Sequence, residues 1–111
     1  MGHPLKLLMG PVSVGATGTH TFTYTHPVDV HASLIDAIQG EILSGTQTGV
    51  VAFNWGNAVG MTREIYRTSL TAADPAACRN PKRVIYPGQV VEIAFSAVTA
   101  GDVVQASIGG H

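Results

Sequence analysis

Apolar and polar residues alternate with a period of two through much of this chain, and such alternation predicts half-buried β-strands. It is most regular over residues 19–26, where aromatic and histidine side chains alternate with four threonines. We expect the aromatic face to pack inward, because threonine suits an exposed extended backbone without adding charge. The threonines that would form the outer face are Thr19, Thr21, Thr23 and Thr25.

The last third of the chain, residues 83–108, holds three runs rich in β-branched residues, separated by two turn signals. Pro87 and Gly88 suit the centre of a type II turn, since proline sets a negative φ and glycine accepts a positive one. A second reversal is expected at Gly101. The pattern predicts three antiparallel strands. Glu92 has the opposite parity to the large apolar residues around it, so we expect it to face outward.

The period changes over residues 29–39, where the apolar positions gather on one side at helical spacing. This pattern is typical of an amphipathic helix of about three turns. Asp29 fits the N-cap, and Gly40 fits the position just beyond the end, where a left-handed residue is common. Residues 28–34 also alternate, so a strand is the alternative; we favour the helix.

Together these patterns predict about seven or eight short strands with one short helix at about residues 29–39. Strands in that number, separated by turn signals, favour a mainly β fold, namely a small antiparallel β-sandwich or jelly roll. At 111 residues the chain is expected to form a single domain, residues 1–111.

Charged residues make up 12% of the chain, about half the usual share of ~25%, and the formal net charge is −1. The absence of a basic excess argues against nucleic acid as a partner. Low charge favours association, so we expect a homo-oligomer, a dimer or a trimer. Four arginines fall within one short window and form either a basic patch or separate solvated groups: Arg63, Arg67, Arg79 and Arg83.

The apolar run near the N-terminus is short and interrupted by Lys6, so we expect no signal peptide and synthesis in a cytoplasm. No segment approaches the ~20 apolar residues of a membrane span, and a membrane partner is not expected.

Catalytic and cofactor motifs are not found, so we expect neither an enzyme nor a bound cofactor. No pair of carboxylates has the spacing of an acid and a base, and the glycines form no phosphate-binding loop. Cys78 has only Arg79 nearby to activate it. No metal site is expected either, because the histidines are poorly spaced; His26 and His31 are the pair that a chain reversal at Pro27 would bring together.

Trp55 lies close to two amides, Asn54 and Asn57, and Tyr66 follows in the next strand. An aromatic platform flanked by amides is typical of carbohydrate-binding modules, which stack a sugar face on the ring. The alternative is a tryptophan buried in a core or an interface.

Taken whole, the chain resembles the small β-sandwich decoration, or cement, proteins on the capsids of tailed bacteriophages. The resemblance lies in the compact size, the low charge, the threonine-rich strand at residues 19–25 and the sheet from Tyr86 to Asp102. It implies a structural virion protein that bridges major capsid subunits and has no catalytic residues. Alternatives are a head–tail joining or tail component, and a carbohydrate-binding module that uses Trp55. The interface or ligand residues that we expect are Trp55, Asn54, Asn57, Arg63, Tyr66, Arg67, Thr19, Thr21, Thr23 and Thr25.

Overall fold

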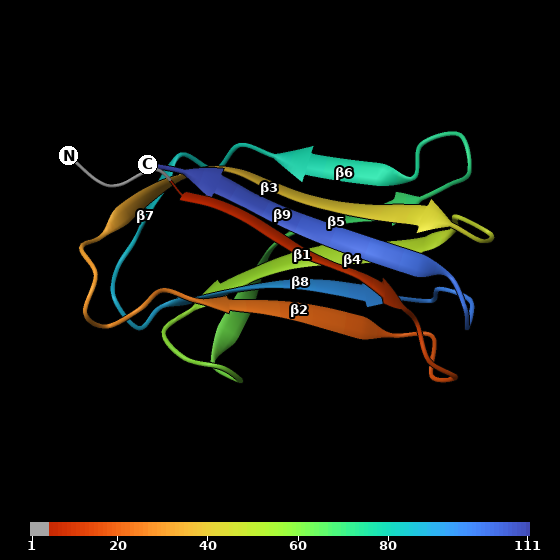
Figure 1. Ribbon diagram of the computed structural model, residues 1–111, viewed down its shortest axis with the longest axis horizontal. Coiled ribbons are helices and arrows are strands. Elements are labelled where there is room, and N and C mark those ends of the chain that lie inside the picture. Colours follow the sequence, from red (N-terminus) through yellow and green to blue (C-terminus); the bar gives the residue numbers. More distant parts are fainter. Residues whose placement is uncertain (1–4) are drawn as a thin grey trace.

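The computed structural model describes residues 5–111 as two antiparallel β-sheets packed face to face (Figure 1). No helix occurs in this part of the chain, and so no helix there could cross a bilayer. The strands are β1 (Leu5–Ser13), β2 (His20–Thr25), β3 (Ser33–Ser44), β4 (Gly49–Gly56), β5 (Thr62–Leu70), β6 (Ala76–Arg79), β7 (Arg83–Ile85), β8 (Val90–Ser96) and β9 (Val103–Gly110).

The order of the strands is that of a jelly roll. The five-stranded sheet runs β1-β9-β3-β6, with β7 also pairing with β3, and the four-stranded sheet runs β2-β8-β4-β5. Because β6 and β7 together occupy one edge beside β3, each sheet has four strand positions. The chain crosses between the sheets at every connection except β4 to β5 and β6 to β7, as in a double Greek key. The prediction of a mainly β sandwich or jelly roll is confirmed.

The three strands predicted in the last third of the chain are present as β7, β8 and β9. They do not pair with one another, because β8 belongs to the four-stranded sheet, while β7 and β9 each pair with β3 in the five-stranded sheet. The turn at Pro87 and Gly88, with a φ of 87° at the glycine, therefore carries the chain across the sandwich. Glu92 faces outward as expected, since it lies opposite exposed Thr23.

The helix predicted at residues 29–39 is wrong, because this segment leads into β3. A β-bulge explains the misleading period. The register between β3 and β9 shifts between Ile35 and Ala37, so the next inward side chain after Ile35 is Ile38, three residues later. One such step inside a strand imitates the spacing of a helical face. Asp29 and Gly40 accordingly cap no helix.

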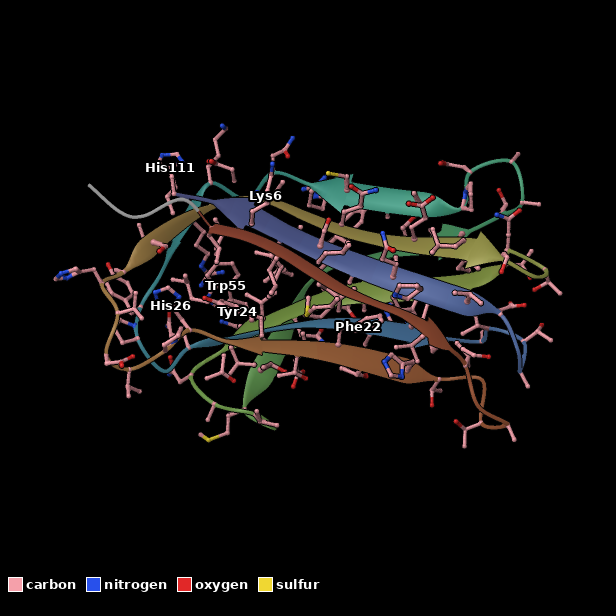
Figure 2. All side chains as sticks on the ribbon, viewed as in Figure 1. Lys6, Phe22, Tyr24, His26, Trp55 and His111 are labelled. Atoms are coloured by element: carbon pink, nitrogen blue, oxygen red, sulfur yellow. The ribbon has the colours of Figure 1, made fainter. Side chains whose placement is uncertain are left out.

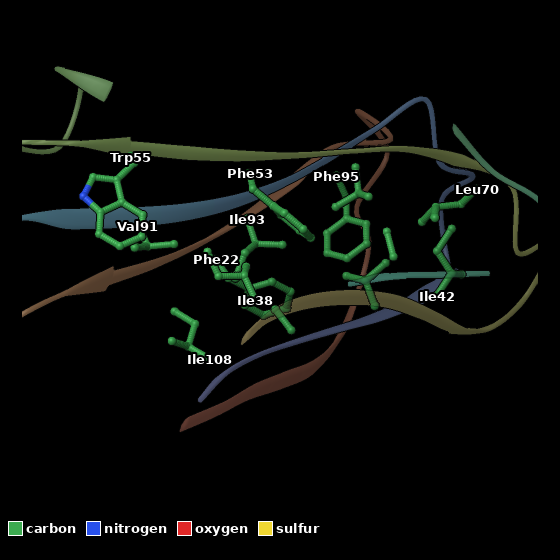
Figure 3. Packing of buried hydrophobic residues seen from close by; sticks show 14 of the residues in the cluster. Phe22, Ile38, Ile42, Phe53, Trp55, Leu70, Val91, Ile93, Phe95 and Ile108 are labelled. Carbon is green, nitrogen blue, oxygen red and sulfur yellow. The ribbon is translucent and has the colours of Figure 1, made fainter. Parts of the chain in front are cut away.

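The core fills the space between the sheets with aliphatic side chains and three phenylalanines (Figure 3). Gly40, in the middle of β3, is buried within it. A Cβ there would lie 3.0 to 3.2 Å from Val51, Phe95 and Ile93 of the opposite sheet. The missing side chain of Gly40 thus makes room for these three residues.

Candidate functional site

An open polar pocket of about 240 Å³ lies at one end of the sandwich. Its walls come from the end of β4, the start of β5, β7 and the turn before β8, so both sheets contribute. Figure 2 shows Trp55, one of its residues, toward the same end as His26. The lining residues are Trp55, Gly56, Asn57, Met61, Thr62, Arg63, Arg83 and Gln89.

Two arginines reach this pocket from opposite sheets. Arg63 of β5 lies directly across from Trp55 of β4, so both side chains leave the sheet on its inner face. Arg83 of β7 lies across from buried Ile35 and also points inward. Its guanidinium carbon is 4.8 Å from the centre of the Trp55 ring, which is a cation–π contact. The ion pairs among the described residues include neither Arg63 nor Arg83, and no carboxylate lines the pocket.

Hydrogen bonds already occupy most of the acceptors near the pocket. The Gln89 side-chain amide donates to Asn57 Oδ1 at 3.0 Å and accepts from the backbone N–H of Tyr86 at 2.9 Å. The Thr62 hydroxyl donates to Glu92 Oε1 at 2.9 Å. Trp55 Nε1, by contrast, is buried and has no partner in the described structure. Unused donors therefore outnumber unused side-chain acceptors on the pocket wall.

The structure brings together three of the predicted site residues: Trp55, Asn57 and Arg63. It places the others elsewhere. Asn54 and Arg67 lie on the outer face of the four-stranded sheet, where Arg67 pairs with Glu64 at 2.8 Å. Tyr66 packs against the core with Arg79 4.6 Å above its ring.

Pocket residues absent from the predicted set are Arg83, Gln89, Thr62, Met61 and Gly56. In the sequence, Arg83 stands out only as one of four closely spaced arginines. Gln89 has no distinguishing feature there beyond its position after the turn at Pro87 and Gly88.

The arrangement of Trp55 disfavours sugar stacking on its ring. Only 2% of its surface is exposed, one ring face carries Arg83, and the ring belongs to the buried core cluster. A sugar would have to displace Arg83 to reach it.

The histidines do not form a metal site in the described part of the chain. His26 is 2% exposed, and its Nε2 lies 2.7 Å from the backbone carbonyl of His31, to which it must donate. Its Nδ1 therefore accepts from the Tyr24 hydroxyl at 2.7 Å. Through these two hydrogen bonds, the His26 ring ties β2 to the connection between β2 and β3. Burial also raises the pKa of Tyr24 above its ordinary value of 10.0.

The threonine face predicted for β2 is present. Phe22 and His26 are buried, while the alternate positions are exposed on the outer face: Thr19, Thr21, Thr23 and Thr25. Because β2 is an edge strand, these threonines lie along a free border of the sandwich.

Comparison with known proteins agrees with the fold but does not assign a family. No family model matches the chain, and no curated protein matches it. The crystal structure of PirA is similar, with a TM-score of 0.51 and 11% identity over 100% of this chain and 95% of that one. The Drosophila NLP-core, a structure that provides insight into pentamer formation and histone binding, gives a TM-score of 0.44 and 12% identity over 98% of this chain and 96% of that one. At such identities the likeness to PirA concerns the fold alone.

Proposed function

We propose that this chain is a structural subunit of a virion, a capsid decoration protein that acts by assembly. The observation that carries the proposal is the β2 edge, which lacks every common protection against pairing with another chain. An edge strand presents a row of unpaired N–H and C=O groups, and proteins usually guard it with charges, proline or a bulge.

The other edges are guarded. The β1 edge contains Lys6 and Pro11 and has a register shift beyond Met9. The β5 edge has its own bulge and charged side chains. The third edge is broken between β6 and β7 at Pro81. The charged residues of these last two edges are Arg63, Glu64, Arg67, Arg79 and Arg83.

The β2 edge, His20–Thr25, has no formally charged residue, no proline and no glycine, and its register with β8 is unbroken. A second copy can therefore add its own β2 antiparallel to it and join the two four-stranded sheets. A two-fold arrangement of this kind is self-complementary. Threonines on the outer face would then meet across the junction, and such cross-strand pairs contribute roughly 0.2–1 kcal/mol each.

The virion setting is supported by three further features. Jelly rolls recur among capsid proteins. Few charged residues cover the surface, which weakens repulsion between neighbours. The chain also resembles capsid decoration proteins in size and threonine content. In this setting the exposed faces of the joined sandwich would contact the major capsid protein.

Oligomeric mass tests the edge. Size-exclusion chromatography with light scattering should give a dimer for the native chain and a monomer for the double variant Thr21→Lys, Thr23→Lys, because lysines repel across the junction. The matched control is Ser44→Lys, Ser69→Lys, which adds the same charge at two other exposed positions and should stay dimeric. A monomeric native chain would reject pairing through β2.

The virion setting needs its own test. An antibody to the chain should label tailed particles purified from the source that expresses it. Signal confined to the particle-free fraction would reject the decoration role while leaving the oligomer result intact.

A further inference from the structure

The pocket at the end of the sandwich has positive charge with no counter-charge in its wall. Arg63 and Arg83 both line it, neither has an ion-pair partner among residues 5–111, and no aspartate or glutamate is in the lining. A planar guanidinium offers two parallel N–H donors, a geometry that matches a carboxylate or phosphate. An anion that entered would therefore gain charge-assisted hydrogen bonds.

Neutral donors add to this excess. Trp55 Nε1 is a buried donor without a partner, and buried polar groups are otherwise almost always hydrogen-bonded. Figure 3 shows its nitrogen directed away from the other labelled core side chains. The Asn57 oxygen is taken by Gln89, which leaves the Asn57 NH₂ group as a further donor. The wall thus favours a ligand rich in acceptor oxygens.

Size narrows the class of ligand. The volume of about 240 Å³ equals roughly eight water molecules at ~30 Å³ each. It lies below the ~300 Å³ at which ordinary ligand pockets begin. A bare phosphate or sulfate would leave most of this space empty, whereas one sugar ring with a carboxylate would fill it and supply both the anion and several hydroxyls.

We propose that this pocket binds one acidic monosaccharide, with the carboxylate held between Arg63 and Arg83. The Asn57 NH₂ group contacts the sugar hydroxyls. The proposal does not depend on assembly through β2. It also differs from aromatic stacking, since Trp55 stays beneath Arg83 and contributes only through the edge of its ring.

Trp55 supplies the readout, because it is the only tryptophan of the chain and lies in the pocket wall. Titration with sodium glucuronate should change its fluorescence saturably. Glucose, at an ionic strength matched with sodium chloride, should not, since it has the ring and hydroxyls without the charge. Calorimetry on the same samples measures affinity independently of the fluorophore.

Arginine variants locate the site. Arg63→Gln and Arg83→Gln should each weaken glucuronate binding at least tenfold with the melting temperature retained. Arg67→Gln is the matched control, since Arg67 pairs with Glu64 outside the pocket, and it should bind normally. Methyl glucuronide should bind as tightly as the free acid if glycan ends are the source, and more weakly if free acids are.

Three results would overturn the proposal. One is no saturable binding of glucuronate by the native chain. Another is equal binding of glucuronate and inorganic phosphate, which would indicate a general anion site. The last is equal loss of affinity in Arg67→Gln and the pocket variants, which would indicate non-specific charge attraction.

Discussion

Removal of the Asp102 carboxylate should cost about 3 kcal/mol of unfolding free energy. Asp102 is 2% exposed and joins two connections at the end of the sandwich away from the pocket. Its oxygens accept from the Thr46 N–H at 3.0 Å, the Thr46 hydroxyl at 2.8 Å and the Thr99 N–H at 3.1 Å. Three bonds at about 1 kcal/mol net each give this figure for Asp102→Ala; the value for an ordinary hydrogen bond is used, rather than the higher one for charged groups, because water can reach exposed Thr46 and Thr99.

The pH dependence of this effect has a defined sign. Burial alone would raise the pKa of Asp102, but the hydrogen bonds from Thr46 and Thr99 outweigh it, and the net pKa lies below the ordinary 3.8. The stabilisation is therefore complete above pH ~4 and is lost as the pH falls through the lowered folded-state pKa.

Urea denaturation followed by circular dichroism measures both quantities. The difference in unfolding free energy between the native chain and Asp102→Ala should stay constant from pH 7 to pH 5 and decrease below pH 4. Asp29→Ala, which removes an exposed carboxylate, should change stability by less than about 0.5 kcal/mol. A gap under 1 kcal/mol at pH 7, or one that stays constant down to pH 2.5, would refute this reasoning.

Two further predictions concern the core and the β2 strand. Gly40→Ala should destabilise by about 1–3 kcal/mol in urea, because the new methyl group crowds Val51 and Phe95; unchanged stability would mean that the sheets separate freely. Ionisation of Tyr24 should weaken the fold in alkali, since its raised pKa means that its contribution is full below pH 10 and falls as the pH rises through the folded-state value. Tyr24→Phe should therefore lose less stability than the native chain between pH 9 and pH 11, and equal losses would contradict this.

Local patterns in the sequence were enough to predict most strands, because strand parity follows directly from alternation. The threonine face of β2 and the outward Glu92 are confirmed for this reason. The helix at residues 29–39 failed because a bulge after Ile35 has no signature in a single sequence and imitates helical spacing. Pairing also lay beyond local patterns, since β7, β8 and β9 follow each other along the chain yet alternate between sheets.

The pocket could be predicted only in part. Trp55, Asn57 and Arg63 come from one hairpin, so closeness along the chain brings them together in space. Arg83 belongs to the opposite sheet, and its contact with Trp55 depends on how the two sheets stack. Strand parity indicates which way a side chain points but not which side chain it meets across the core.

A single unguarded edge also limits how many copies of the chain could join by strand pairing. When the β2 strands of two copies pair, each has used its open border, and every remaining border carries charge, proline or a bulge. A sandwich with open borders on both sides would instead add copies without end and form a fibre. Under the proposed pairing through β2, strand addition would therefore end after one step, and any larger array would have to be built through side-chain contacts on the faces of the joined sheets.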